Sequence, residues 1–354
     1  MGIRTRSFAN NILSGGAFDA TDLDGALPSS NINDTSVTNI TAVPALVATT
    51  TVASDPPAPD AGQIWYNTTD RVLRGYVLSA GSWATGGNLN TARSALGGTG
   101  TQTEALAFGG DAGPPSSATE EYNGATWSNG GSLATARYGL GGAGIQTAGL
   151  AISGYNGVNL PATEEYDGST WTSGGAVSTA RRLMGSTGLQ TAALIFSGYT
   201  TANTAVTEEY NGTSWTAGGN VNTARHYLPG TGTQTAALGF GGDAPGATGV
   251  TEEYDGTSWT NSSNLNTARY THSGAGLQTA TLAFGGNLPP YTAATEEYNG
   301  STWSNTTSLS TARYNLAGAG TLPSALAFGG DTTGFQSGTE EWTKALVTTA
   351  LGAS

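Results

Sequence analysis

The 354-residue sequence contains no cysteine, only two histidines, and 12 basic residues against 25 acidic ones. Without cysteine, neither a disulfide framework nor a thiolate metal site nor a cysteine nucleophile can form. A net charge of −13 argues against a nucleic-acid partner, because displacing counterions from phosphates requires a basic surface. No apolar run reaches the 18 residues of a membrane span, and no signal-peptide core lies near Met1, so we expect cytoplasmic synthesis.

The sequence also lacks long stretches with apolar residues at helical spacing, and its 54 glycines disfavour helices. What it contains instead is an internal repeat. Thr-Glu-Glu begins at Thr119 and returns every 44 residues, tryptophans keep this interval from Trp83, and Thr-Ala-Arg keeps it from Thr91. Six copies of a repeat of this length indicate a solenoid or a propeller, and the composition predicts an all-β fold.

Each repeat contains signals for four strands. In one copy we predict strands from Arg137 to Ala143, from Thr147 to Ser153 and from Thr163 to Tyr166, and a fourth strand at Trp171. The dipeptide Asp167-Gly168 lies between the last two strands and has matching Asn-Gly or Asp-Gly pairs in other copies. Such dipeptides favour a two-residue type I′ turn, so the last two strands should form a hairpin.

The two ends of the array complement each other. After Thr339-Glu340-Glu341-Trp342 the turn dipeptide and the fourth-strand tryptophan are missing, and Thr343-Lys344 and Val347 stand in their places, so the last repeat lacks its fourth strand. Trp83, in contrast, marks a fourth strand that precedes the first complete repeat. We therefore expect the residues from Gly81 to Thr85 to complete the last four-stranded unit.

A double glycine or Ser-Gly ends the second predicted strand of every repeat, as at Gly109-Gly110 and Ser153-Gly154. With the Glu-Glu-Tyr third strand and the tryptophan on the fourth, this order resembles the kelch repeat. The resemblance covers about residues 79 to 346 and implies a six-bladed β-propeller with four strands per blade. It implies little about function, because propellers include both enzymes and binding proteins.

The repeats leave shorter segments on either side. Residues 1–60 are rich in small polar residues and proline, and can bury too little surface to fold alone, so we expect an extended anchoring arm held by another protein or another copy. In residues 61–78 two short β-prone runs flank the turn Asn67-Thr68-Thr69-Asp70, which predicts a β-hairpin or neck. The propeller should span residues 79–346, and residues 347–354 should form a C-terminal tail.

Charged residues of the repeats occupy equivalent places in every copy, whereas a single active site needs its groups in only a few copies. We therefore interpret them as structural ion pairs. Neighbouring glutamates on a strand point to opposite faces, so one of each pair should meet an arginine and the other solvent. The repeated tyrosines and tryptophans are interpreted as packing residues, with carbohydrate stacking as the alternative. The structural charges are Arg93, Arg137, Arg181, Arg225, Arg269, Arg313, Glu120, Glu121, Glu164, Glu165, Glu208, Glu209, Glu252, Glu253, Glu296, Glu297, Glu340 and Glu341.

Positions that differ between the copies are the candidates for recognition. They follow the repeat arginine directly or lie between the second and third strands, and loops of this kind often carry binding residues. Drift of unconstrained loops explains the differences equally well. The candidate recognition surface comprises Ser94, Tyr138, Arg182, His226, Tyr270, Tyr314, Tyr155, Tyr199 and Tyr291. His226 and His272 lack a second ligand at a metal-binding spacing, so we predict no metal, no cofactor and no catalytic residue.

Three short segments, Met1 to Ala9, Ala20 to Ser30 and Gly62 to Thr69, resemble the starts of bacteriophage tail-fibre and other virion appendage proteins of the marine or cyanophage type. The resemblance implies a non-enzymatic structural protein of the virion. Residues 1–60 would bind other virion proteins, and the propeller would face outward, toward host-surface glycans. Assembly of several copies is an open alternative. The second functional hypothesis is a bacterial secreted or cell-surface lectin-like propeller, followed by a glycan-active enzyme.

Overall fold

The structure is a computed structural model that describes residues 50–56 and 63–350. Its regular secondary structure in these ranges is entirely β, with 28 strands. The chain divides into two compact units: the first holds the described residues up to Ser79 and those from Ala345 onward, and the second spans Ala80–Lys344. No helix that could cross a membrane occurs in the described ranges.

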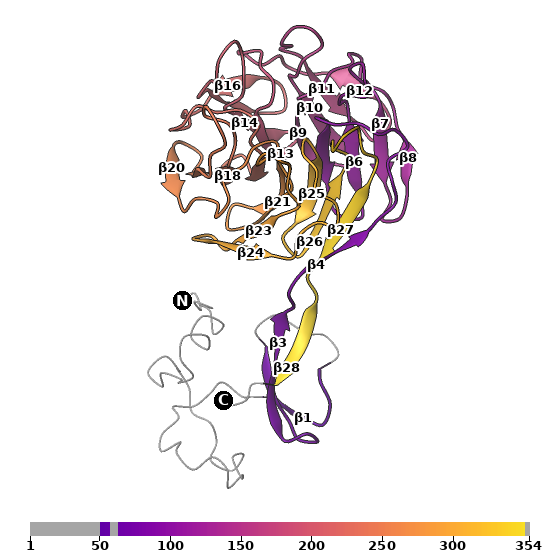
Figure 1. The fold of residues 1–354 in the computed structure, drawn as a ribbon, viewed down its shortest axis with the longest axis vertical. Helices are drawn as coiled ribbons and strands as arrows, with labels where there is room; N and C mark the ends of the chain where they lie inside the picture. Colours follow the sequence, from indigo (N-terminus) through magenta and orange to yellow (C-terminus); the bar gives the residue numbers. More distant parts are fainter. Residues whose placement is uncertain (1–49, 57–62, 351–354) are drawn as a thin grey trace. The chain divides into compact units, whose positions relative to one another are not determined.

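The larger unit consists of six antiparallel sheets of four strands each (Figure 1). Five sheets use consecutive strands: β5 (Gly97–Gly100), β6 (Ala105–Phe108), β7 (Thr119–Tyr122), β8 (Trp127–Asn129); β9 (Gly141–Ile145), β10 (Ala148–Ile152), β11 (Thr163–Tyr166), β12 (Trp171–Ser173); β13 (Gly185–Leu189), β14 (Ala192–Phe196), β15 (Thr207–Tyr210), β16 (Trp215–Ala217); β17 (Gly230–Gly232), β18 (Ala237–Phe240), β19 (Thr251–Tyr254), β20 (Trp259–Ser262); β21 (Ser273–Leu277), β22 (Ala280–Phe284), β23 (Thr295–Tyr298), β24 (Trp303–Thr306).

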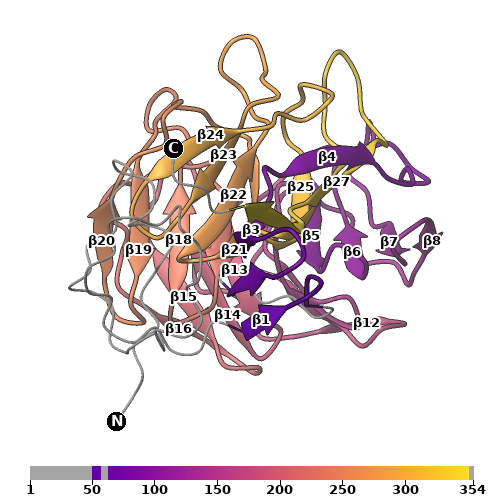
Figure 2. The ribbon, with the colours of Figure 1, turned by 90° about the horizontal axis from the view of Figure 1, so that it is seen from below.

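The sixth sheet joins the two ends of the array. It consists of β25 (Ala317–Thr321), β26 (Ser324–Phe328), β27 (Thr339–Thr343) and β4 (Ser82–Thr85). Strand β4 pairs antiparallel with β27, and Trp83 lies opposite Trp342. In Figures 1 and 2 the indigo β4 lies beside the yellow β27. The array therefore closes on itself through a strand that precedes the first complete repeat.

The first strand of a repeat begins later than the sequence pattern predicts. In the copy that we parsed, β9 starts at Gly141, whereas the prediction began at Arg137. Arg137 is fully buried, Tyr138 makes only an isolated bridge, and Gly139 has a positive φ of 60°, which breaks an extended strand. The residues after the repeat arginine therefore form a connection between sheets.

The turn between the third and fourth strands also differs from the prediction. Tyr166 pairs with Trp171, so the loop has four residues and not two. Asp167 stabilises it by accepting hydrogen bonds from the amides of Ser169 and Thr170 at 2.9 and 2.7 Å, and only Gly168 adopts a positive φ, of 90°. Two positive φ values, as in a type I′ turn, are not needed here.

The six sheets meet at a common centre. Their first strands contact each other in the order β5, β9, β13, β17, β21, β25, and β25 contacts β5 again. Six backbone hydrogen bonds of 2.7–3.0 Å link the connections just before these strands. The amide of each residue donates to the carbonyl of the equivalent residue in the preceding sheet, and the amide of Ala95 donates to the carbonyl of Asn315, which closes the circle. The six residues are Ala95, Gly139, Leu183, Tyr227, Thr271 and Asn315. This arrangement is consistent with a β-propeller.

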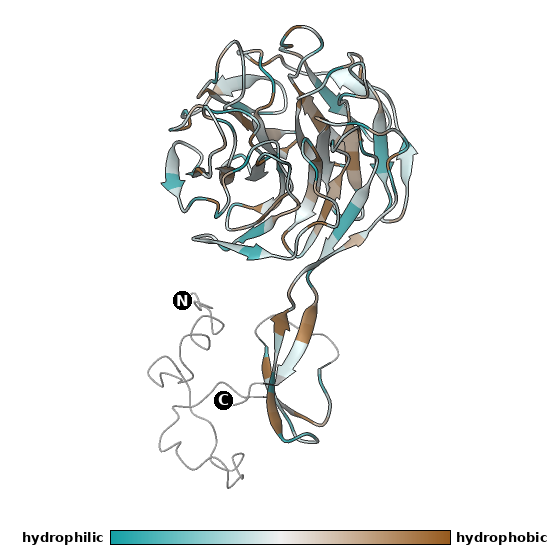
Figure 3. Cartoon of the chain, in the orientation of Figure 1, coloured by the Kyte–Doolittle hydropathy of each residue, from teal (hydrophilic) through white to brown (hydrophobic). Residues whose placement is uncertain are grey.

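The smaller unit is a separate four-stranded sheet with the order β1 (Thr50–Val52), β2 (Ile64–Asn67), β3 (Val72–Leu78) and β28 (Leu346–Ala350). Strands β2 and β3 form the hairpin expected in residues 61–78. Strand β28 corrects the prediction of a C-terminal tail for residues 347–350, because they pair antiparallel with β3, while residues 351–354 lie outside the described residues. Figure 3 shows hydrophobic residues along β3 and β28. Most of the arm predicted for residues 1–60 lies outside the described residues, but β1 belongs to it and pairs with β2.

Candidate functional site

The repeat arginines and the first glutamates of the Glu-Glu pairs form six buried ion pairs. Each arginine lies 27 residues before its glutamate, at the same place in every sheet. The pairs are Arg93–Glu120 (2.9 Å), Arg137–Glu164 (3.0 Å), Arg181–Glu208 (2.6 Å), Arg225–Glu252, Arg269–Glu296 (3.3 Å) and Arg313–Glu340 (3.1 Å). Burial lowers the pKa of Arg225, and the neighbouring Glu252 counteracts this effect. These charges are enclosed in the sheets and cannot reach a ligand.

We expected the second glutamate of each pair to face solvent. Instead, each of these glutamates contacts a side chain of a neighbouring sheet. Five of them accept a hydrogen bond from a tyrosine hydroxyl of the next sheet, as Glu121 does from Tyr166 at 2.5 Å. Burial, and then this hydrogen bond, raise the pKa of Tyr166 to about 12. At the sixth position tryptophan replaces tyrosine, and Glu297 pairs with Lys344 at 2.5 Å instead. These contacts tie neighbouring sheets together.

Tryptophans and glutamines add two further sets of contacts between sheets. Each repeat tryptophan donates its indole N–H to a threonine of the preceding sheet, for example Trp259 to Thr207 at 3.1 Å, and Trp83 donates to Thr295 in the same way. Five glutamines donate to two backbone carbonyls of the preceding sheet, as Gln234 does. The repeated aromatic side chains are thus occupied in packing, which leaves no exposed row of them for carbohydrate stacking.

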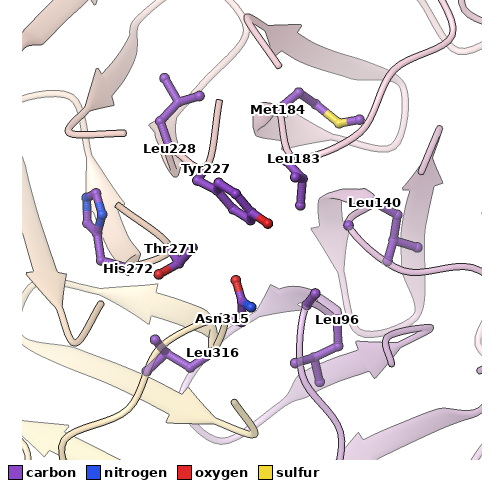
Figure 4. Close-up of a pocket in the computed structure, with 12 residues that line it drawn as sticks. Leu96, Leu140, Leu183, Met184, Tyr227, Leu228, Thr271, His272, Asn315 and Leu316 are labelled. Atoms are coloured by element: carbon purple, nitrogen blue, oxygen red, sulfur yellow. The ribbon is translucent and has the colours of Figure 1, made fainter. Parts of the chain in front are cut away.

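Two hollows lie at the centre of the six sheets, with volumes of about 90 and 150 Å³. Figure 4 shows one of them: Tyr227, Leu183, Thr271 and Asn315 point toward its middle. Around them lies a ring of one residue per repeat, Leu96, Leu140, Met184, Leu228, His272 and Leu316. Because small-molecule sites usually measure roughly 300–1,000 Å³, these hollows offer little room for an organic substrate.

His272 is the polar exception in this otherwise aliphatic ring. Its side chain is buried, and burial together with the nearby Arg269 holds its pKa well below the ordinary value. Its imidazole packs 5.5 Å from the ring of Phe240. In residues 50–56 and 63–350 no group of three or more His, Asp or Glu side chains could hold a metal ion. A neutral, packed histidine accounts for this position.

The positions that differ between repeats come together on what we call the loop face. It comprises the residue after each repeat arginine and the loop between the second and third strands. An isolated β-bridge joins the two parts in every repeat: Ser94–Asp111, Tyr138–Tyr155, Arg182–Tyr199, His226–Asp243, Tyr270–Asn287 and Tyr314–Asp331. Eight of the nine candidate recognition residues are half-buried there, whereas Ser94 is only 4% exposed and contributes almost nothing to the surface.

Aromatic side chains on the loop face contact one another across several repeats. The ring of Tyr138 lies 5.6 Å from that of Tyr155, and the ring of Tyr199 lies 5.1 Å from that of His226. The guanidinium of Arg182 connects these pairs, because it lies 4.3 Å from the centre of Tyr155 and 5.0 Å from that of Tyr199. Such distances are typical of cation–π contacts.

The row continues beyond His226. The ring of Tyr227 lies 4.6 Å from that of His226 and 6.0 Å from that of Tyr270, and further along the face Tyr291 lies 5.8 Å from Tyr314. We refer to Tyr138, Tyr155, Arg182, Tyr199, His226, Tyr227 and Tyr270 as the aromatic row. Most aromatic side chains of the loop face therefore lie in one part of it. The equivalent places outside the row are occupied by Ser94, Asp111, Asp243, Asn287, Tyr314 and Asp331.

Two residues of this site were missed from the sequence. Tyr227 follows His226, where the other copies carry Ala95, Gly139, Leu183, Thr271 and Asn315, so extending the comparison of repeats by one position would have revealed it. Asn159 accepts a hydrogen bond from Arg182 Nη1 at 2.9 Å. No sequence signal marks that contact, because it joins loops of two different repeats. The sequence matches none of the models of known protein families and none of the curated proteins with which it was compared.

Proposed function

We propose that this chain is a non-enzymatic recognition protein, in which a six-bladed, kelch-like β-propeller presents the loop face to a glycan. The observation that carries the proposal is the aromatic row. Tyrosine and histidine combine an apolar ring with a polar tip, and side chains of this kind bind sugars through both parts. The row is half-buried and confined to one part of the face, as expected for a binding surface with a few dominant anchors.

The division between constant and variable positions supports the same reading. Buried ion pairs, tyrosine hydroxyls, indoles and glutamines are occupied in holding the sheets together, and they recur in nearly every repeat. The loop face differs from one repeat to the next while its loops keep the same length. A surface that changes on an unchanged scaffold suits recognition of one partner, because loops tolerate substitutions that sheets do not.

We further propose that the protein is an appendage of a bacteriophage particle, anchored through residues 1–60 and displaying the propeller toward the host. The support is the resemblance of the N-terminal segments to virion proteins. Full-length protein should dock onto purified particles that lack it, and a chain without residues 1–49 should not dock while still binding glycan. Equal docking by both forms would contradict the anchoring role and favour a secreted lectin-like protein.

Glycan binding is tested by screening the full-length chain against immobilised oligosaccharides and intact bacteria. Tyr155→Ala and Tyr199→Ala should each weaken binding by about tenfold, because an aromatic anchor at the centre of an interface contributes roughly 1–2 kcal/mol or more. Asp111→Ala is the matched control, since Asp111 occupies the position equivalent to Tyr155 outside the aromatic row. Binding that is unaffected by both tyrosine variants would reject the loop face as the site.

A further inference from the structure

Arg182 stands apart from the other cations of the larger unit. Residues 80–344 are all described and contain eight basic residues besides histidine: Arg93, Arg137, Arg181, Arg182, Arg225, Arg269, Arg313 and Lys344. Seven of them pair with a glutamate at 3.3 Å or less. Arg182 has no carboxylate within ion-pairing distance in these residues. It is thus the one cation of the larger unit without a carboxylate partner, on a protein of net charge −13.

The guanidinium of Arg182 is held in place by neutral groups. Tyr155 and Tyr199 lie on either side at 4.3 and 5.0 Å, and Nη1 donates to Asn159 Oδ1 at 2.9 Å. Asn159 is itself fixed, because its amide donates to the carbonyl of Thr200 at 3.0 Å. The second amino group, Nη2, donates to no protein atom in the described residues. An arginine fixed in this way can bind a ligand without losing further side-chain freedom.

The charged and titratable neighbours of Arg182 are few. His226, in the next repeat, has its pKa lowered by burial, with Asp243 acting against this shift and Arg182 adding to it. The carboxylate of Asp243 accepts a hydrogen bond from the Gly246 amide and is the acidic group of this part of the face. The six buried arginine–glutamate pairs are neutral in sum, and other carboxylates of the larger unit, such as Glu104, Asp167 and Asp255, are exposed to solvent. At physiological salt, charges more than about 8 Å away are strongly screened, so the net charge does not prevent an anion from binding here.

We propose that Arg182 anchors a subsite for an acidic sugar, a glycan residue whose single carboxylate pairs with the free edge of the guanidinium. Guanidinium and carboxylate match in plane and spacing, and such pairs are among the stronger hydrogen-bonded contacts. One cation without a lysine or second arginine beside it suits a singly charged group better than a phosphate dianion. Tyr155 and Tyr199 keep the guanidinium partly out of water, which strengthens its attraction for an anion. This inference rests on the proposed glycan-binding function.

The test compares three probes on the full-length chain by calorimetry: an oligogalacturonate, the same oligosaccharide with its carboxyl groups reduced to alcohols, and a sulphated neutral oligosaccharide of equal length. We expect the acidic probe to bind at least about tenfold more tightly than the reduced one, with an affinity that falls as salt increases. Arg182→Gln should abolish this preference, and Arg182→Lys should retain part of it.

Tyr314→Gln is the matched control, because Tyr314 follows its repeat arginine as Arg182 does but lies outside the aromatic row. It should leave the preference for the acidic probe intact. If acidic and reduced probes bind equally and Arg182→Gln changes neither, the inference fails while the glycan-binding function stands. Equal binding of the sulphated probe would overturn the assignment to a carboxylate. If no probe binds and the wider glycan screen is empty, the proposed function fails as well.

Discussion

At the scale of single residues, the same chemical group has opposite roles in different places of this protein. Arg181 and Arg182 are adjacent in sequence, yet Arg181 is fully buried against Glu208, and Arg182 lies between two tyrosine rings on the loop face. The difference follows from the backbone. Arg181 points into the sheets, and the next residue belongs to the connection that leads to the centre of the molecule.

Removing the arginine of a buried pair should destabilise the protein strongly. Arg225→Ala leaves Glu252, which is fully buried, without its partner. Unfolding by urea should show a loss of about 3–5 kcal/mol, the usual result for one uncompensated buried charge. Arg182→Ala is the control and should lose only about 1 kcal/mol, because it removes cation–π contacts at a half-exposed position. An unchanged unfolding midpoint for Arg225→Ala would contradict a stabilising role of the pair.

His272 should make the protein sensitive to mild acid. Its pKa is lowered in the folded state, so below the ordinary value of 6.5 the unfolded chain takes up a proton that the folded chain does not. The stability contribution is complete above pH 6.5 and decreases by about 1.4 kcal/mol for each pH unit below it, until the folded-state pKa is reached. His272→Leu, which matches Leu96 and Leu228 of other repeats, should remove this slope between pH 6.5 and 5. Parallel stability curves for the two proteins would refute the assignment.

At the scale of strands, the inner strands are rich in glycine because they lie too close together for side chains. A Cβ added at Gly142 would lie 2.8 Å from the carbonyl oxygen of Gly98 in the neighbouring sheet. Ser186 occupies the equivalent place one repeat later. Its hydroxyl lies 2.9 Å from the amide nitrogen and 3.0 Å from the carbonyl oxygen of Gly142, so it fits by replacing a packing contact with hydrogen bonds.

An alanine in such a strand should push two sheets apart. Gly142→Ala is expected to cost about 1–3 kcal/mol, the usual range for overpacking, because its nearest neighbour is backbone and cannot rotate away. Gly334→Ala is the matched control, since nothing lies within 4 Å of the added carbon. Thermal melting of both variants measures the difference. Equal midpoints would show that the inner strands have room to relax.

Sequence periodicity was sufficient to predict an all-β protein with four strands per repeat, because turn residues and buried tryptophans return at a constant interval. It could not give the start of the inner strand. Leu183, Tyr227 and Thr271 adopt positive φ values of 55–58°, which their residue types disfavour. The hydrogen bonds that close the centre impose this conformation, and they depend on contacts between repeats. For the candidate site, the sequence showed which residues differ between copies. It did not show that Arg182 contacts Tyr155, because that contact joins two different repeats.

At the scale of the whole larger unit, the six junctions between sheets are not equal. Five have both a glutamine bound to two carbonyls and a tyrosine hydroxyl bound to a glutamate. At the junction between β21–β24 and the sixth sheet, Leu322 and Trp342 occupy those places. Lys344 and Trp83 supply the side-chain links there, to Glu297 and Thr295.

This junction should open first. Lys344→Met leaves Glu297, whose side chain is only 15% exposed, without its cation and should lower the melting temperature more than Tyr210→Phe does at a junction that keeps its glutamine. Hydrogen exchange should accelerate selectively in β23 and β27. Lys344→Arg should restore protection. Uniform acceleration over all six sheets would show that the junctions open together.

The pairing of β4 with β27 also determines which strands a mechanical force on the smaller sheet would act on. Ser82 lies opposite Thr343, so the two chains that lead to the smaller sheet leave the larger unit from one end of a single pair of strands. In the smaller sheet they continue as β3 and β28, where Leu78 lies opposite Leu346. A force applied through the smaller sheet would therefore reach β4 and β27 together, at one end of one strand pair. Such a force would load both strands of one hydrogen-bonded pair together, so the first and last strands of the array would not be drawn away from each other.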